Sequence, residues 1–260
     1  MHQGKTYIVT GVASGIGART YEVLKDAGAT VIGVDRTPTQ NADQFFEADL
    51  GDAASIDALI DALPSGADGL ANIAGVPPTV DAETLLRVNL YGLQRLTTGL
   101  IPKLADGASI ANLASLAGFG WPNSVAEIKE ALALGLDDDV NGFVEKHDLR
   151  GAEGGRSYKL SKEALIVWTI QNRWTWRDRG ITMNCASPGP VDTPILQDFI
   201  ASLGERAKED RKVMDRPGHP DDVAPVVSFL LSDQAKWFRG ANLNCDGGMS
   251  SHILSNMHGI

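Results

Sequence analysis

The sequence predicts an α/β fold with one doubly wound domain, in which helices cover both faces of a parallel sheet. Short β-rich runs alternate with segments of helical periodicity from the start of the chain, and this alternation is typical of parallel sheets. No stretch rich in Pro, Gly and Ser divides the 260 residues, and no internal repeat occurs. We therefore expect residues 1–260 to form a single domain.

The expected strands are short and largely apolar, as strands buried on both faces are. In chain order they are Tyr7–Thr10, Thr30–Val34, Phe45–Ala48, Gly69–Ile73, Ala108–Leu113, Ile181–Cys185 and Ala241–Asn244. The expected helices carry apolar residues at intervals of three and four. They are Ile16–Asp26, Ala53–Leu63, Ala82–Leu104 and Asp221–Leu231, together with a helix that contains Tyr158 and Lys162.

The stretch from residue 121 to residue 155 is long for a connection in an α/β fold. Val125, Ile128, Leu132 and Leu136 recur in it at helical spacing, and three aspartates at 137–139 can start a second helix. We expect residues 121–155 to form a helical insertion before the helix of Tyr158, packed over one edge of the domain.

The bulk composition is that of an ordinary globular protein, with 43% hydrophobic and 22% charged residues. A formal net charge of -10 argues against a nucleic-acid partner. Cys185 and Cys245 lie in apolar stretches without metal-ligand neighbours, so we expect two reduced thiols and no metal. No targeting segment precedes Lys5, and no apolar run reaches the ~18–20 residues of a membrane span. These features predict a cytoplasmic protein without a membrane partner.

A glycine-rich loop follows the first expected strand. Gly11, Gly15 and Gly17 have the spacing G-x-x-x-G-x-G, with Ser14 and Ile16 between them. Glycines let the backbone turn tightly and approach a pyrophosphate at a helix N-terminus, so the loop predicts a dinucleotide site. A tight turn without a ligand is the alternative.

An acidic residue, Asp35, ends the second expected strand. A carboxylate at this place accepts hydrogen bonds from the adenosine ribose and repels a 2′-phosphate, which favours NAD over NADP. The adjacent Arg36 complicates the choice, because an arginine beside the ribose can accept that phosphate. We expect NAD, with a plain surface acid as the alternative for Asp35.

Tyr158 and Lys162 lie one helical turn apart, so both project from one face of a helix. The unperturbed pKa of a phenol is about 10, and a nearby ammonium can lower it by roughly 1–3 units. Such a pair can take a proton from an alcohol or return one to an alkoxide. The spacing alone is common on solvated helices, and it gains meaning from Ser115 and the glycine-rich loop upstream.

Several motifs occur in one order along the chain, and over nearly its whole length this order resembles the short-chain dehydrogenase/reductase family. The motifs are Thr10–Gly17, Asp49-Leu50, Asn72-Ile73-Ala74-Gly75, Asn89, Ser115, the Tyr158/Lys162 pair and Pro188-Gly189-Pro190-Val191-Asp192-Thr193. The chain differs from the family pattern at Ala71, which replaces the first asparagine of the N-N-A-G motif. That position looks structural in the family.

The resemblance implies a Rossmann fold and hydride transfer between nicotinamide and an alcohol carbon. It implies that Tyr158 is the acid/base, that Lys162 lowers its pKa and binds the nicotinamide ribose, and that Ser115 orients the substrate oxygen. Asn89 would hold a water that relays protons. The implied cofactor contacts beyond the glycine-rich loop are Asp49 and Leu50 at the adenine, Asn72, Ala74 and Gly75 at the adenosine ribose and its strand, and Pro188, Gly189, Val191 and Thr193 towards the nicotinamide.

Structural roles remain open for two of these residues. Ser115 can instead cap a helix or turn, and Ser109 and Ser124 are similarly placed serines. A buried Asn89 that braces the fold would look identical in the sequence.

One branch of the family is especially similar, and it holds coniferyl-alcohol dehydrogenase and the bacterial 3α-hydroxysteroid dehydrogenase/carbonyl reductases. The shared features are the long insertion, Trp121-Pro122, and the runs Lys162–Trp168 and Met183–Leu196. They imply a small-molecule substrate that is a bulky, flat, apolar alcohol or its carbonyl. Five residues flank the catalytic and nicotinamide motifs and are expected to form an apolar wall, although each can equally belong to the core: Phe119, Trp121, Ile195, Leu196 and Phe199.

The resemblance also bears on assembly, since the helix with the Tyr-Lys pair commonly packs against a partner subunit in this family. We therefore expect a homo-oligomer. The insertion then has two compatible roles, as a lid over the alcohol pocket or as an element that alters assembly.

Two other functions remain in competition with the dehydrogenase. A catalytically silent nucleotide-binding regulator would not need Ser115, Tyr158 and Lys162 together. An epimerase or dehydratase usually carries a larger C-terminal substrate domain, for which the chain has no room.

Overall fold

The computed structural model describes residues 1–150, 155–193, 196 and 213–260. Within them, seven strands form one parallel sheet in the order β3-β2-β1-β4-β5-β6-β7. The strands are β1 (Thr6–Thr10), β2 (Thr30–Asp35), β3 (Gln44–Glu47), β4 (Ala67–Asn72), β5 (Leu104–Leu113), β6 (Thr182–Pro188) and β7 (Asn242–Cys245). The expected doubly wound sheet is confirmed, and each expected strand is present.

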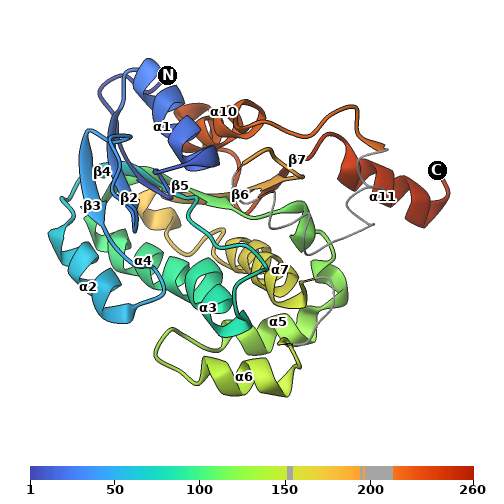
Figure 1. Cartoon of the computed structure of the whole chain (residues 1–260). Helices are drawn as coiled ribbons and strands as arrows, with labels where there is room; N and C mark the ends of the chain where they lie inside the picture. The colour runs from blue at the N-terminus through green and yellow to red at the C-terminus, as the bar shows by residue number, and fades with distance from the viewer. Residues whose placement is uncertain (151–154, 194–195, 197–212) are drawn as a thin grey trace.

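Helices cover both faces of this sheet (Figure 1). Tyr7 and Val9 of β1 face one apolar core, while Ile8 faces the other, as the two-residue period of a strand requires. The first core is closed by α1 (Gly15–Asp26) and α10 (Pro220–Leu231). The second is closed by α2 (Ala53–Ala62), α4 (Leu93–Leu100) and α7 (Arg156–Gln171).

The expected long helix at 82–104 is wrong in detail. It consists of α3 (Ala82–Leu86), a π-helical turn (Arg87–Gly92), α4 and a 3-10 turn (Ile101–Lys103), after which β5 already begins at Leu104. Pro102 lies in the 3-10 turn, and proline lacks the backbone N–H that an α-helix would need there. The π turn matters for the site, because it carries Asn89.

The stretch 121–155 contains α5 (Val125–Leu132) and α6 (Val140–Lys146), as the periodicity predicts. Ile128, Val140 and Phe143 belong to the same apolar core as Leu160 of α7. The two helices therefore pack onto the domain along its lower edge in Figure 1. That they are an insertion relative to other proteins stays a prediction.

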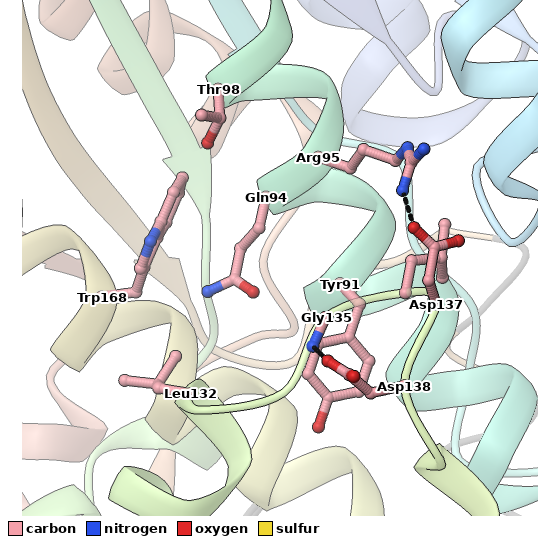
Figure 2. Close-up of a pocket in the computed structure, with 10 residues that line it drawn as sticks. Tyr91, Gln94, Arg95, Thr98, Leu132, Gly135, Asp137, Asp138 and Trp168 are labelled. Carbon is pink, nitrogen blue, oxygen red and sulfur yellow. Dashed lines mark hydrogen bonds and ion pairs between the residues drawn. The ribbon is translucent and has the colours of Figure 1, made fainter.

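A cavity of about 310 Å³ lies between α4, α7 and the loop that joins α5 to α6 (Figure 2). Arg95 crosses its edge, where its guanidinium forms ion pairs with Asp57 at 2.7 Å and with Asp137 at 2.5 Å. The Tyr91 hydroxyl is buried there without a hydrogen-bond partner among the described residues. None of the predicted catalytic or cofactor residues lines this cavity.

The last helix, α11 (Met249–His258), follows β7, and its outer residues are exposed. In the described part of the chain, we find no helix with both the length and the apolar character of a membrane span.

Candidate active site

The loops that follow β1, β2, β4, β5 and β6 meet at the carboxyl edge of the sheet. The chain order of the strands reverses between β1 and β4. In open α/β sheets this switch point is where ligands bind, beyond the carboxyl ends of the strands. The predicted site residues fall on these five loops, on the loop after β3 and on the neighbouring helices.

The glycines of the loop after β1 lie where a side chain would not fit. Gly11 and Gly15 have φ angles of 75° and 54°, which L-residues rarely adopt. A Cβ on Gly17 would lie 1.9 Å from the carbonyl oxygen of Gly11, and one on Gly11 would lie 2.8 Å from the backbone of Ala74. The loop therefore requires glycine at these positions, and it packs directly against the segment after β4.

Helix α1 begins at this loop with an uncapped end. Ser14 is its N-cap residue, and the serine side chain makes no capping hydrogen bond. The first turn, which includes Ile16, holds no acidic residue. Its unpaired backbone N–H groups and the positive end of the helix dipole are a favourable place for a phosphate group.

Asp35 lies at the end of β2, where its carboxylate is held by the backbone. Its two oxygens accept hydrogen bonds from the N–H groups of Ala13 and Thr37, each at 3.0 Å. The carboxylate is thus fixed beside the glycine-rich loop and keeps lone pairs for further donors. Arg36 next to it is exposed.

Thr10 joins the ends of β1 and β4, a role that the motifs did not indicate. Its hydroxyl accepts hydrogen bonds from the N–H groups of Ile73 at 3.0 Å and Ala74 at 3.1 Å. The sequence shows only that a threonine directly precedes the first glycine of the loop, because the partners of its hydroxyl lie more than 60 residues away. The bond holds Ala74 and Gly75 next to the glycine-rich loop.

Asn72 keeps its side chain in the core, which leaves its backbone for the predicted contact with the ribose. Its side-chain amide donates to the Thr97 hydroxyl at 2.9 Å and to the Asn112 carbonyl oxygen at 2.8 Å, and the residue is 2% exposed. The amide is therefore used inside the core, between β4, β5 and α4. Ala71 beside it is fully buried in β4.

Asp49 and Leu50, the expected adenine neighbours, follow β3. The Asp49 carboxylate accepts from the Gly51 N–H at 2.8 Å, while the Asp49 N–H donates to the Ser55 hydroxyl at 2.9 Å. The Leu50 side chain is buried, and its carbonyl oxygen lies where a Cβ on Gly92 would be. The turn is thereby anchored against the π turn before α4.

Asn89 braces the fold with its side chain, so the predicted water relay would have to use its backbone. Its Oδ1 accepts from the Val76 N–H at 2.8 Å, and its Nδ2 donates to the Val76 carbonyl oxygen at 3.0 Å. Both ends of the amide are thus occupied by one residue of the loop after β4. A Cβ on Gly75 would lie 3.1 Å from Asn89 Oδ1 and 4.0 Å from Lys162 Nζ, so these three residues converge.

Ser115 and Tyr158 lie side by side, although they are far apart in the sequence. Their hydroxyl groups are hydrogen-bonded to each other. Ser115 also caps the short turn that follows β5, since its Oγ accepts from the Ala117 N–H at 3.1 Å. The capping role is therefore confirmed, and it is compatible with the predicted role in the site. Ser109 is different, because it is buried in β5 and bonded to Lys236.

Lys162 is almost fully buried on the same face of α7 as Tyr158. Its ammonium donates to the Leu113 carbonyl oxygen at 2.8 Å and lies 5.7 Å from the centre of the Tyr158 ring. This carbonyl at the end of β5 gave no signal in the sequence, because any residue supplies one.

Burial controls the ionisation of both groups. It raises the pKa of Tyr158 to about 12, against the lowering effect of the Ser115 hydrogen bond. It lowers the pKa of Lys162 to about 8. The expected lowering of the Tyr158 pKa by Lys162 is therefore wrong for the chain on its own, since desolvation disfavours the charged form of each group.

The loop after β6 returns to the glycine-rich loop. Gly189 packs closely on Asp246 after Pro188, and Val191 pairs with Gly218 in an isolated parallel bridge. The Thr193 hydroxyl donates to the Val191 carbonyl oxygen at 3.3 Å, and its methyl group lies 3.2 Å from where a Cβ on Gly15 would be.

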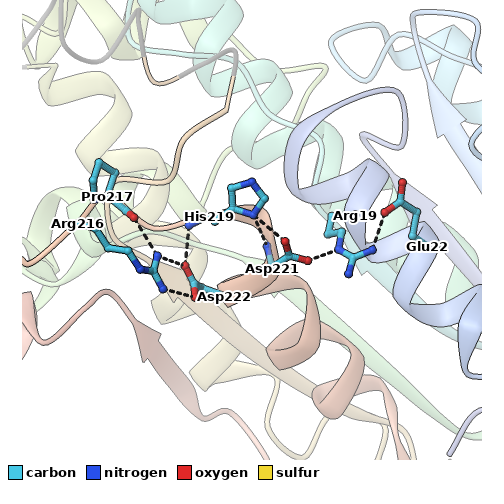
Figure 3. Close-up of polar contacts among 7 residues, drawn as sticks. All are labelled: Arg19, Glu22, Arg216, Pro217, His219, Asp221 and Asp222. Atoms are coloured by element: carbon cyan, nitrogen blue, oxygen red, sulfur yellow. Dashed lines mark hydrogen bonds and ion pairs between the residues drawn. The ribbon is translucent and has the colours of Figure 1, made fainter.

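The segment that pairs with this loop is fastened to α1 and α10 by ionic contacts (Figure 3). Arg216 binds the Asp222 carboxylate through two N–H groups, at 2.6 and 2.8 Å. Arg19 of α1 binds Asp221, and His219 caps α10. The groups are largely exposed, so each contact contributes little alone, but together they hold the Gly218 turn beside the first helix.

The residues of the expected apolar wall have different surroundings, and the wall itself stays a prediction. Phe119 is half-buried, and Leu196 is buried. Trp121 is half-buried too, and it packs against the core around Leu165 instead of standing free. Ile195 and Phe199 lie outside the described residues.

Known proteins are similar to this chain over nearly its full length. A family model described as short chain dehydrogenase matches residues 5–126, and one described as enoyl-(acyl carrier protein) reductase matches residues 146–250. Coniferyl-alcohol dehydrogenase of Pseudomonas sp. (strain HR199 / DSM 7063) is 43% identical, covering 95% of this chain and 97% of its own. The 3-alpha-hydroxysteroid dehydrogenase/carbonyl reductase of Comamonas testosteroni is 29% identical, covering 94% and 96%.

A solved structure agrees with the sequence relatives. The 3-alpha-hydroxysteroid dehydrogenase of Pseudomonas sp. B-0831, crystallised with NADH, superposes with a TM-score of 0.80 at 30% identity. The match covers 96% of this chain and 98% of that structure. From its sheet, its glycine-rich loop and these relatives, the chain belongs to the short-chain dehydrogenase/reductase family of oxidoreductases.

Proposed function

We propose that this oxidoreductase is an NAD-dependent alcohol dehydrogenase and carbonyl reductase for bulky, flat, apolar substrates. One observation carries the proposal: Ser115, Tyr158 and Lys162 converge at the carboxyl edge of the sheet, next to a loop that only glycines can form. A fold alone would not support this function, but a phenol, a hydroxyl and an ammonium in one buried place do.

The residues around the glycine-rich loop fit a dinucleotide. Gly11, Gly15 and Gly17 allow close approach of a pyrophosphate to the end of α1. Asp35 is fixed where it accepts from ribose hydroxyls, which favours NAD over NADP. Further contacts would come from Asp49, Leu50, the backbone at 72–75, Pro188, Gly189, Val191 and Thr193. The relative crystallised with NADH supports this choice.

Bound NAD supplies the acceptor for the hydride that leaves the alcohol carbon. The chain itself supplies the proton chemistry. Ser115 donates a hydrogen bond to the substrate oxygen, and Tyr158 as phenolate removes the proton from that oxygen. In the reverse direction the neutral Tyr158 returns the proton to the carbonyl oxygen. Lys162 in its charged form favours the phenolate, which burial alone disfavours.

The substrate class rests on the relatives and on apolar residues near the site. The relatives act on coniferyl alcohol and on 3-alpha-hydroxysteroids, as their names state. Phe119 and Leu196 lie in the segments that follow Ser115 and Thr193. Coniferyl-type alcohols are the preferred class, because the coniferyl-alcohol dehydrogenase has the higher identity of the two.

We also propose that the chain works as a homo-oligomer, which exposed aromatic side chains support. Trp174 and Trp237 are 56% and 94% exposed, and Phe238 is 36% exposed. The turn at Gly240 packs against Arg173, so these aromatic residues lie in neighbouring segments. Apolar surface of this kind marks interaction sites. Sedimentation velocity tests the oligomeric state, and a purely monomeric chain at micromolar concentration would contradict the proposed homo-oligomer.

The function is tested by following NADH formation at 340 nm with a panel of alcohols, with NAD and NADP in parallel. The panel holds coniferyl and cinnamyl alcohols, 3α-hydroxysteroids and simple cyclic alcohols. We expect turnover of coniferyl-type alcohols with NAD. Binding of NAD without turnover of any alcohol would contradict the proposal and favour a nucleotide-binding regulator.

A further inference from the structure

We propose that Arg156 is a positioning residue, which fixes the segment from Ser115 to Glu127 against the helix of Tyr158 and so sets the Ser115–Tyr158 geometry. The inference rests on the proposed function, since it concerns how the proposed catalytic pair is held. It assigns a role in the site to helix α5.

Arg156 bridges two carboxylates from different helices. Its Nη1 binds Glu163 Oε2 at 2.7 Å, and its Nη2 binds Glu127 of α5. The Glu163 side chain is 6% exposed, while those of Arg156 and Glu127 are 25% and 21% exposed. A buried carboxylate needs a counter-charge, so Arg156 stays with Glu163, and α5 is then held through Glu127.

The bridge closes a continuous line of contacts along α7. Ser115 is bonded to Tyr158 at one end. A Cβ on Gly118 would lie 2.8 Å from the backbone of Lys162, and one on Gly120 would lie 3.3 Å from Glu163 Oε1. The segment after β5 therefore lies flat on α7, and the ion pairs of Arg156 fasten its far end.

The position of Arg156 in the chain strengthens this assignment. It is the first residue of α7 and precedes Tyr158 by half a turn, while Glu163 directly follows Lys162. A planar guanidinium can bind two carboxylates in fixed directions, which an ammonium cannot do equally well. The same side chain thus links α5 to the start of α7 and to Glu163, the two positions that flank the Tyr-Lys pair.

Other ion pairs of the same region lack these properties. The Arg150–Glu145 pair has side chains that are 57% and 61% exposed, and Lys146–Glu130 has 63% and 46%. Exposed pairs of this kind contribute little to position or stability. Arg150 is therefore a matched control for Arg156.

The test compares Arg156→Met, Arg156→Lys and Glu127→Gln with the control Arg150→Met. For each protein, kcat and KM for coniferyl alcohol, the Kd for NADH and the melting temperature are measured. Glu127→Gln leaves the buried Glu163 paired with Arg156. It therefore loosens α5 without leaving a buried carboxylate unpaired. Hydrogen exchange of the amides at 115–127 reports the tether without turnover.

We expect kcat to fall about 10- to 100-fold in Arg156→Met and less in Glu127→Gln, with NADH affinity unchanged and faster exchange at 115–127. Arg156→Lys should lie between wild type and Arg156→Met, and Arg150→Met should equal wild type. Unchanged kcat and exchange in folded Glu127→Gln and Arg156→Met would overturn the proposal, as would a parallel loss of NADH affinity. A wild-type chain without alcohol turnover would contradict the proposed function, while the exchange data would still decide the tether.

Discussion

The two halves of the candidate site are built by different means. The cofactor half, around β1, β2 and α1, is made of backbone: Gly11, Gly15 and Gly17 leave space, and N–H groups hold Asp35. The catalytic half, around β5 and α7, is made of side chains, with the half-buried Tyr158 and the buried Lys162 at its centre. The first half depends on space and the second on electrostatics, so mutations should separate binding from chemistry.

The pKa values show how strongly burial acts in the catalytic half. The pKa of Tyr158 is raised to about 12 and that of Lys162 is lowered to about 8, so Tyr158 is held neutral in the chain alone, while Lys162 stays largely protonated at neutral pH. The positive charge of oxidised nicotinamide adds to that of protonated Lys162 when NAD is bound, and both favour the phenolate.

The largest effect is expected from Tyr158→Phe, which removes the acid/base of the catalytic half. We expect kcat to fall by about 10²- to 10⁴-fold, because the neighbouring Ser115 hydroxyl is a much weaker acid than a phenol and cannot take over the proton exchange. The Kd for NADH, measured by fluorescence titration, should stay close to wild type. Full turnover in this variant would contradict the role of Tyr158 as the acid/base.

Gly17→Ala tests the cofactor half in the same way. The added Cβ would lie 1.9 Å from the Gly11 carbonyl oxygen, so the loop must shift away from its binding shape. We expect NADH affinity to fall more than tenfold and the free energy of unfolding to fall by about 1–3 kcal/mol. Gly135→Ala is the control, since its Cβ would meet its nearest neighbour at 3.6 Å. Equal NADH affinity in both variants would contradict the spatial explanation.

Asp35→Ala should change the choice of cofactor without changing the chemistry. Removal of the carboxylate ends its repulsion of the 2′-phosphate, and the exposed Arg36 remains beside it. We expect the ratio of kcat/KM for NADP to that for NAD to rise about tenfold or more. Glu47→Ala removes the exposed acid paired with Asp35 in the sheet register and serves as control. An unchanged ratio would remove Asp35 from the ribose site.

A buried histidine before the amino end of β1, away from the site, predicts a pH dependence of stability. The His2 ring bonds to Tyr7 at 2.8 Å and Ser228 at 2.9 Å, and burial, followed by the N-terminal charge, lowers its pKa. The unfolded chain then binds more protons just below about pH 6.5, so stability should fall as the pH drops through this range. The free energy of unfolding, measured with urea at several pH values, should change less with pH in His2→Gln than in wild type. The same pH dependence in both, with exposed His258→Gln as control, would exclude His2 as the cause.

The smallest effect is expected from Tyr91→Phe, next to the catalytic half. The Tyr91 hydroxyl is buried without a partner among the described residues. Its removal therefore ends the cost of burying an unpaired polar group and leaves no other group without its hydrogen bond. We expect the free energy of unfolding to rise by about 1 kcal/mol in urea titrations, with kcat and NADH affinity unchanged. A clear loss of stability would mean that this hydroxyl has a partner.

The cofactor half could be predicted well from the sequence, and the catalytic half only in outline. Backbone requirements act on residue type, so the spacing of Gly11, Gly15 and Gly17 shows in the sequence. The Tyr158–Lys162 spacing is equally local. By contrast, whether the side-chain amides of Asn72 and Asn89 face the core or the site depends on hydrogen-bond partners in other elements of the fold.

Tertiary burial explains the other differences. The pKa of Tyr158 shifts in the opposite direction to the one expected, because desolvation by burial outweighs the lowering effect of the Ser115 hydrogen bond. The bridge of Arg156 joins residues 29 positions apart, and the short motif around Tyr158 contains no sign of it. Such contacts follow from packing, which local patterns do not encode.

Direct hydride transfer is the central claim, and isotope transfer tests it most directly. Coniferyl alcohol that carries deuterium on its carbinol carbon is incubated with NAD and the wild-type chain, and the reduced nicotinamide is examined by NMR. We predict deuterium at C4 of the nicotinamide ring, with none in the Tyr158→Phe reaction over the same time. Bound NAD that remains oxidised, or reduced nicotinamide without deuterium, would contradict the account.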